Sequence, residues 1–265
     1  MKNTVVIYHA NCLDGFGAAY AAWLTLGNCA DYIPAKYGSE PPDVRGKHVY
    51  ILDFSYPRDV LIQMCKDSQS MLVLDHHKTA QKDLEGLPFA KFDMTKSGCI
   101  LAWERLNHFK APPRLLSIIQ DRDLWQFKLD GTKEITAALY SFVPFEFKAW
   151  EALDIDELYL RGKDLLLVQE KDVNQAFERR HEIYLDGHTG LACNAIPKLS
   201  SDLGHKLATE SGTFGAVYYY DGERNKWCFS LRSNGDFDVS TIAKTYGGGG
   251  HKNAAGFEID TLSLF

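Results

Sequence analysis

Residues 71–77 read MLVLDHH, in which a short aliphatic run leads directly into Asp75, His76 and His77. A continuous apolar run of this length is typical of a strand buried on both faces of a parallel sheet. Consecutive residues of an extended segment point in opposite directions, so one histidine can bind a ligand while the other faces a second group. Burying an acid and two imidazoles beside such a strand is unfavourable unless they are paired or bound to a metal. The stretch therefore predicts a buried strand with a metal or ion-pair site at its end.

Two aliphatic runs upstream, residues 4–8 and 49–52, also lead into polar side chains. These side chains are His9, Asn11 and Asp14 after the first run and Asp53 after the second. In an open parallel sheet, ligands gather at the carboxyl ends of the strands. Several carboxylates there would repel one another unless a cation neutralised them, and imidazole and carboxylate groups suit Mn²⁺ or Mg²⁺. The three strand ends together predict one divalent-metal site.

The rest of the first half alternates strand and helix patterns, which indicates an α/β fold with a parallel sheet. Further strands are predicted at 31–35 and 89–92, and helices at 17–26, 57–66 and 98–106. From 112 to 184 the apolar residues recur with helical spacing, which predicts a helical connector. Strand patterns return at 190–196, 215–220 and 226–232, with helices at 203–209 and 239–246. We expect a catalytic domain at 1–130, a connector at 131–187 and a smaller α/β substrate-binding domain at 188–265.

Composition excludes several classes of protein. Of 265 residues, 45% are hydrophobic and 24% charged, which is typical of an ordinary globular chain and not of a disordered one. The formal net charge of −6 argues against binding along a long duplex. No apolar run is long enough to span a bilayer, so a cytoplasmic protein without membrane contact is expected. Six scattered cysteines without a CxxC pair suggest neither a disulfide framework nor a structural zinc site.

Two further stretches carry candidate site residues. Asp121 and Asp123 flank Arg122 at the end of an apolar helical run, and either acid could complete a metal shell or form a surface network with the arginine. In the C-terminal part, Gly247–Gly250 precede His251, and bare backbone there could approach an anion closely. Arg232, at the end of a predicted strand, has the planar fork suited to phosphate. A flexible loop and an ordinary exposed arginine are the alternatives.

In this combination the chain resembles the DHH phosphoesterase family, in the branch with a glycine-rich DHH-associated C-terminal domain. The resemblance covers nearly the whole chain. The motifs that carry it are His9-Ala10-Asn11-Cys12-Leu13-Asp14-Gly15, Asp53, Asp75-His76-His77, Asp121 within QDRD, and Gly247–His251 followed by NAAG.

The resemblance implies a phosphodiesterase in which two metal ions, usually Mn²⁺ with Mg²⁺ as an alternative, activate a water molecule. Asp53 would bridge both ions, with His9 on one and Asp14 and His76 on the other. Asp75 and Asp121 would complete the shells, and His77 would act with Asp75 at the scissile phosphate. Arg232, Gly248, Gly249, Gly250 and His251 would bind the substrate.

One position departs from the family pattern. Many members carry an additional Asp two residues before the one that matches Asp14, and here that position is Cys12, beside Asn11. Cys12 could bind a softer ion, Asn11 could supply an oxygen ligand, or the site could fill only with substrate. The alternative is that Cys12 packs as a small apolar residue.

We expect hydrolysis of short oligonucleotides, such as nano-RNA or linear dinucleotides, to nucleoside monophosphates. The alternatives are a RecJ-like exonuclease on single-stranded DNA, which predicts a basic channel with aromatic platforms, and a catalytically silent nucleotide-binding module. The expected partner is a short single-stranded oligonucleotide or a dinucleotide, and a homodimer is left open.

Overall fold

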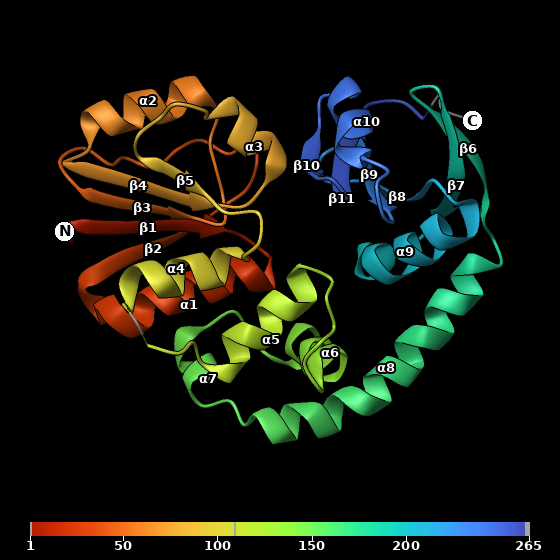
Figure 1. Ribbon diagram of the computed structural model, residues 1–265, viewed down its shortest axis with the longest axis horizontal. Coiled ribbons are helices and arrows are strands. Elements are labelled where there is room, and N and C mark those ends of the chain that lie inside the picture. Colours follow the sequence, from red (N-terminus) through yellow and green to blue (C-terminus); the bar gives the residue numbers. More distant parts are fainter. Residues whose placement is uncertain (1, 109, 263–265) are drawn as a thin grey trace. The chain divides into compact units, whose positions relative to one another are not determined.

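The computed structural model describes residues 2–108 and 110–262 (Figure 1). The chain forms two compact units, residues 1–166 and residues 167–265. The boundary between them lies inside the long helix α8, Ile155–Phe177, which is the helical connector expected from the sequence. The predicted α/β fold class is confirmed in both units.

The first unit contains a five-stranded sheet in the order β2-β1-β3-β4-β5, and every neighbouring pair is parallel. Its strands are β1 Thr4–His9, β2 Ala30–Ala35, β3 His48–Leu52, β4 Ser70–Asp75 and β5 Ala90–Phe92. All five coincide with predicted strands to within two residues. Since β1, β3 and β4 are neighbours and run in the same direction, the residues that follow them emerge at the same edge of the sheet.

Helices cover both faces of this sheet (Figure 1). They are α1 Leu13–Leu26 and α4 Gly98–Leu106 on one face, and α2 Arg58–Asp67 and α3 Lys78–Asp83 on the other. Alternate strand residues supply the two cores, because successive side chains of a strand point to opposite faces. Val6 packs with α1 and α4, whereas Val5 and Ile7 pack with residues of α2. With both faces buried, the strands need the continuous apolar runs that the sequence shows.

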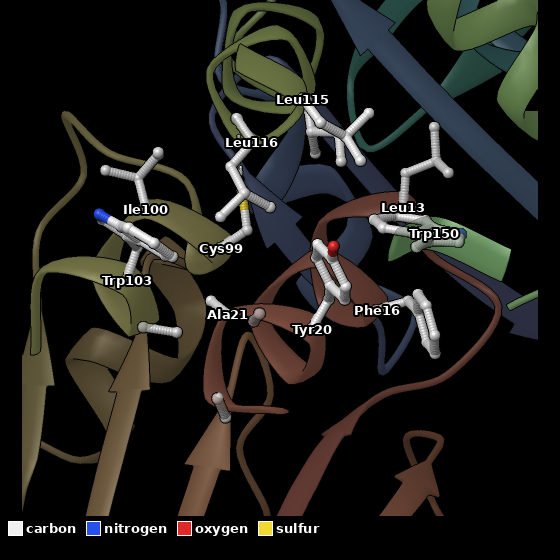
Figure 2. Packing of buried hydrophobic residues seen from close by; sticks show 14 of the residues in the cluster. Leu13, Phe16, Tyr20, Ala21, Cys99, Ile100, Trp103, Leu115, Leu116 and Trp150 are labelled. Carbon is white, nitrogen blue, oxygen red and sulfur yellow. Dashed lines mark hydrogen bonds between the residues drawn. The ribbon is translucent and has the colours of Figure 1, made fainter. Parts of the chain in front are cut away.

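The first unit also contains helices α5 Arg114–Asp123, α6 Thr132–Phe142 and α7 Phe147–Glu151. Figure 2 shows Leu115 and Leu116 of α5 in the same cluster as Cys99 of α4 and Phe16 of α1. The ring of Phe16 also lies 4.7 Å from that of Trp150, centroid to centroid. Part of the segment expected to be connector, residues 131–166, therefore belongs to this unit.

The second unit contains a six-stranded sheet in the order β10-β11-β9-β8-β7-β6, mixed in direction because β7 and β8 are parallel. Its strands are β6 His181–Leu185, β7 His188–Asn194, β8 Phe214–Asp221, β9 Lys226–Ser233, β10 Gly249–His251 and β11 Ala254–Ile259. Helix α9, Ser200–Ser211, packs against Val217 and Cys193, and helix α10, Val239–Thr245, against Ala216 and Leu231. Val217 and Ala216 point to opposite faces of β8, so the two helices cover opposite faces.

One predicted element is wrong. The helical stretch predicted to reach residue 184 ends earlier, and residues 181–184 belong to strand β6. Ile183 and Leu185 are buried while Glu182 and Tyr184 are exposed, which is the two-residue period of a half-buried strand. Short one-turn 3-10 helices at Gly27–Cys29 and Pro197–Leu199 complete the described elements. None of the helices in residues 2–108 and 110–262 is long and apolar enough to cross a membrane.

Candidate metal centre

Histidine and aspartate side chains meet at the carboxyl edge of the parallel sheet, as the sequence predicts. His9 is the last residue of β1, Asp53 follows β3 and Asp75 is the last residue of β4. His76 and His77 lead from β4 into α3. The order of the strands brings these residues together although they come from three separate stretches of the sequence.

His76 lies at the centre of the cluster. Its Nε2 atom is 3.1 Å from Oδ1 of Asp53, 3.5 Å from Oδ2 of Asp14 and 3.6 Å from Oδ2 of Asp123. The side chains of His76, Asp14 and Asp53 are each at most 2% exposed. On the other side of Asp53, its Oδ2 atom lies 3.5 Å from Nδ1 of His9. Asp53 thus has one oxygen facing each of two histidines.

His77 and Asp75 form a separate pair beside Asp53. Nδ1 of His77 lies 2.6 Å from Oδ1 of Asp75, and the hydroxyl of Ser55 donates to Oδ2 of the same carboxylate at 2.6 Å. The backbone N–H of His76 also donates to Asp75. Asp75 is therefore satisfied by several donors and holds the ring of His77 in place.

The backbone around the cluster is under steric constraint. Asp53 has φ of +54°, a left-handed conformation that is uncommon outside glycine and often marks functional sites. Its N–H bonds to the carbonyl of Leu74. A Cβ atom added to Gly15 would lie 2.2 Å from the carbonyl oxygen of His9, so only glycine fits where α1 passes the end of β1. The unusual backbone conformation and the close contact thus occur where the chain positions Asp53 and His9.

Asp14 is held by the first turn of another helix. The backbone N–H groups of Gly98 and Cys99 donate to its two carboxylate oxygens at 2.6 and 3.0 Å. These N–H groups belong to the start of α4, where donors have no partner within the helix and a negative charge is favoured. Both oxygens of Asp14 are therefore held by α4, and one of them, Oδ2, also faces His76.

The acids and imidazoles of the cluster shift one another's pKa values because they lie close together and are buried. Burial, together with the charges of Asp53 and Asp123, raises the pKa of Asp14 to about 8. Burial opposes ionisation of Asp53, but the neighbouring imidazoles of His76 and His9 outweigh it and hold its pKa well below the usual value. Burial would lower the pKa of His76, but Asp53, Asp123 and Asp14 raise it to about 10. Without a metal, protons on Asp14 and His76 balance the charge of this cluster at neutral pH.

Among the described residues of the first unit, the donor atoms form three groups of a size that fits a metal ion. They are His9, Cys12 and Asp53; Asp14, His76 and Asp123; and Asp53, Asp75 and His77. Within each group the candidate ligand atoms lie within 4.8 Å of one another. Metal–ligand bonds of about 2.0–2.3 Å place ligands on opposite sides of an ion roughly 4–4.6 Å apart, so small contractions would close each shell.

A second observation also fits a bound cation. Nδ1 of His9 is buried and has no hydrogen-bond partner among the residues that the structure describes. A buried ring nitrogen without a partner is unfavourable, whereas a metal would accept its lone pair. The donor set and its geometry therefore fit divalent metal binding, with Asp53 shared between groups.

Asp121, predicted to complete a metal shell, does not fit this role. Its carboxylate accepts hydrogen bonds from the backbone N–H groups of Lys128 and Leu129 and from the hydroxyl of Thr132. It organises the loop between α5 and α6 and belongs to none of the three donor groups. Asp123, which the sequence left as the alternative, faces His76 instead.

Two neighbouring positions of the first motif differ in their surroundings. Asn11 is exposed and has φ of +59°. Its left-handed backbone turns the chain from β1 into α1. Cys12 follows as the N-cap residue of α1, with its sulfur in the group of His9 and Asp53.

Several residues that shape the centre were not identified from the sequence. Ser55 bonds Asp75, and Gly98 and Cys99 bond Asp14. Ser55 lies two residues after Asp53, which is the only local signal of its role. The contact of Gly98 with Asp14 spans 84 positions and has no signature in spacing or composition.

In the second unit, Arg232 and His251 lie at the same level of the sheet. Both pair with Ala254 of β11, Arg232 from β9 on one side and His251 from β10 on the other. Residues directly opposite in antiparallel strands point to the same face, so both side chains share one face. The guanidinium of Arg232 also donates to the hydroxyl of Ser201 at the start of α9.

The glycine-rich segment is more ordered than a flexible loop. Gly249 and Gly250 form β10 with His251, and a Cβ atom on Gly248 would lie 2.0 Å from the carbonyl oxygen of Gly256. Gly250 has φ of +138° and would meet the carbonyl of Ala254 at 2.6 Å. Close strand packing alone therefore requires glycine at 248 and 250, and the predicted role of these glycines in anion binding stays a prediction.

Comparison with known proteins gives results for both units. A family model of the DHHA1 domain matches residues 188–264. An uncharacterized protein of Acanthamoeba polyphaga mimivirus is 34% identical over 281 residues, covering 95% of this chain. The chain spans 66% of the length of that viral relative.

Similar folds occur among solved structures. An exopolyphosphatase-related protein from Bacteroides fragilis matches 98% of this chain and 87% of its own, at 14% identity and a TM-score of 0.60. RecJ from Thermus thermophilus, solved in complex with Mn²⁺, matches 97% of this chain and 49% of its own, at 14% identity and a TM-score of 0.51. At these identities the two structures show a shared fold.

Proposed function

We propose that this chain, which belongs to the DHH/DHHA1 phosphoesterase superfamily, is a metal-dependent phosphodiesterase. Its substrates would be short oligonucleotides such as linear dinucleotides or nano-RNA, and its products would be nucleoside monophosphates. The observation that carries the proposal is that Oδ2 of Asp53 faces His9, a member of one donor group, while its Oδ1 faces His76, a member of another. A carboxylate shared in this way is suited to hold two divalent ions side by side. Such ions would lower the pKa of a water molecule and neutralise charge on phosphoryl oxygens.

The protein's own residues have distinct roles in this proposal. His9 and Asp53 hold one ion, and Asp14, His76 and Asp123 hold the other, with Mn²⁺ as the expected metal and Mg²⁺ as the alternative. The first turn of α4 keeps Asp14 oriented. Asp14 is therefore oriented before a metal binds.

We assign His77 and Asp75 to the reacting phosphate. Nδ1 of His77 bonds Asp75. A proton on the second ring nitrogen, Nε2, therefore points away from Asp75. Burial opposes the charged form, but the charge and hydrogen bond of Asp75 raise the pKa of His77 to about 9. In the metal-free protein His77 therefore holds its proton at neutral pH, and such an N–H group can donate to a phosphoryl oxygen.

The second unit would bind an anionic group of the substrate. Arg232 and His251 share one face of its sheet, and a guanidinium and an imidazole on the same face suit a phosphate. The net charge of −6 favours a short substrate, since binding along a long strand usually relies on many cationic contacts.

The test is a product assay with purified protein and Mn²⁺. Separate reactions contain a 5′-phosphorylated dinucleotide, a cyclic dinucleotide, a ~20-nucleotide single strand and pyrophosphate. We expect mononucleotides from the linear dinucleotide at the highest rate. Preference for the long strand would replace the proposal with an exonuclease, and binding without turnover would replace it with a silent nucleotide-binding module.

A further inference from the structure

We infer that the thiolate of Cys12 is a direct ligand at one of the two metal positions and makes that position selective for borderline-soft ions such as Zn²⁺ or Co²⁺ over Mg²⁺. The inference rests on the proposed function, since it deepens the description of the same centre. It is carried by the group of His9, Cys12 and Asp53, whose sulfur, nitrogen and oxygen atoms lie within 4.8 Å of one another.

The main chain fixes the sulfur in this position. Asn11 adopts φ of +59°, and Cys12 then occupies the N-cap of α1 with extended φ and ψ. The carbonyl of Cys12 accepts the first hydrogen bond of the helix, from Phe16. Ser, Thr, Asp and Asn are the usual residues at an N-cap. Cysteine is an unusual choice there, and its sulfur instead stands beside His9 and Asp53.

The neighbouring groups also indicate a ligand at this point. Nδ1 of His9 is buried without a hydrogen-bond partner among the described residues and lies 3.5 Å from Asp53. An ion bound by the nitrogen, the sulfur and the carboxylate satisfies all three, and the thiol proton is released to solvent on binding.

The two metal positions then differ in chemistry. The group of Asp14, His76 and Asp123 offers oxygen and nitrogen donors, which accept Mn²⁺ or Mg²⁺. The group with Cys12 adds sulfur, which favours Zn²⁺ and Co²⁺ and disfavours Mg²⁺. We therefore expect a centre that binds two different ions when both kinds are present.

Cobalt titration of the whole protein tests this directly. Co²⁺ bound to a thiolate gives an intense charge-transfer band in the near ultraviolet, which oxygen and nitrogen ligands do not give. We expect the band in the wild type, its loss in Cys12→Ser, and its retention in Cys29→Ser, whose thiol is exposed and belongs to none of the donor groups. Circular dichroism checks that each variant is folded.

Affinity measurements add a second readout. Loss of the sulfur should weaken Zn²⁺ binding by ~100-fold or more, since even partners that only orient ligands contribute about 10–100-fold. Cys12→Asp should keep binding of two ions and raise the affinity for Mg²⁺ relative to Zn²⁺. A wild type that binds two Co²⁺ ions without the band would overturn the role of Cys12 and leave the proposed function standing. A wild type that binds no Co²⁺, Mn²⁺ or Zn²⁺ would overturn both.

Discussion

A Cβ atom placed on Gly98 would lie 2.4 Å from Cβ of Asp53, closer than side-chain carbons approach in proteins. The same glycine donates its N–H to Asp14. The start of α4 thus sets the position of two acids, Asp14 in α1 and Asp53 after β3. We expect Gly98→Ala to displace Asp53 and weaken Mn²⁺ binding by at least ~10-fold. Isothermal titration calorimetry measures this, with Gly222→Ala as the control because its nearest neighbour is 3.9 Å away. Unchanged affinity in Gly98→Ala would show that the contact has no role in metal binding.

Asp121 and Asp123 should differ in the property that each one controls. Asp121→Asn removes charge from an acceptor of three hydrogen bonds and should lower the free energy of unfolding by about 1–3 kcal/mol. Asp123→Asn should leave stability nearly unchanged and weaken binding of one Mn²⁺ ion. Denaturant unfolding and metal titration on both variants separate these effects. The reverse pattern would restore Asp121 as the ligand.

Metal binding should release protons at neutral pH. The pKa of Asp14 is raised to about 8 and that of His76 to about 10, so both carry protons in the metal-free protein at pH 7. A metal ion displaces them, and its affinity should therefore rise with pH from about 6 to 8, up to tenfold per pH unit for each proton released. Calorimetry in two buffers with different ionisation enthalpies counts the protons. An apparent enthalpy that is the same in both buffers would rule out this exchange.

Stability of the metal-free protein should fall as pH rises above neutrality. His76 has a pKa of about 10 in the folded chain and an ordinary value of 6.5, so its contribution is fully present below pH 6.5 and is lost as pH rises toward 10. The raised pKa of Asp14 acts in the same direction up to about pH 8. We expect Tm to decrease between pH 7 and 10 without metal and to decrease less with Mn²⁺. A flat or rising Tm of the metal-free protein would contradict these shifts.

Substrate capture should depend on the second unit. His251→Ala and Arg232→Lys are expected to raise KM for a dinucleotide about 5–50-fold with little change in kcat, because each removes a binding contact and leaves the metal ligands in place. Lys226→Ala is the control, since its exposed side chain lies at the other end of β9 and pairs with Asp260. Equal losses of kcat and kcat/KM in His251→Ala would instead place this residue in the chemical step.

Much of the fold could be predicted because its signals are local. Three aliphatic runs indicated β1, β3 and β4, and the helix predicted at 98–106 has the observed bounds. Strands β10 and β11 were missed because glycine and alanine dominate Gly249–Ala255, and these residues carry no strand pattern. Their pairing depends on backbone contacts with β9, which only the folded sheet provides.

The sequence predicted at which edge of the sheet the site lies, but not which side chain of each segment faces it. The rule that parallel strands deliver ligands to one edge brought His9, Asp53 and Asp75 together. It could not choose between Asp121 and Asp123, because residues two apart on a helix point to different sides and the register of α5 decides which faces His76. The support from Ser55 and Gly98 is tertiary and has no pattern in the sequence.

Anomalous X-ray scattering at the manganese edge, on crystals grown with Mn²⁺, shows whether the protein binds two ions at Asp53. We expect two manganese peaks about 3.5–4 Å apart beside Asp53 in the wild type, and loss of at least one in Asp53→Asn together with a fall in kcat/KM of at least ~100-fold. Crystals at saturating Mn²⁺ that show no peak among His9, Asp53 and His76 would contradict this expectation.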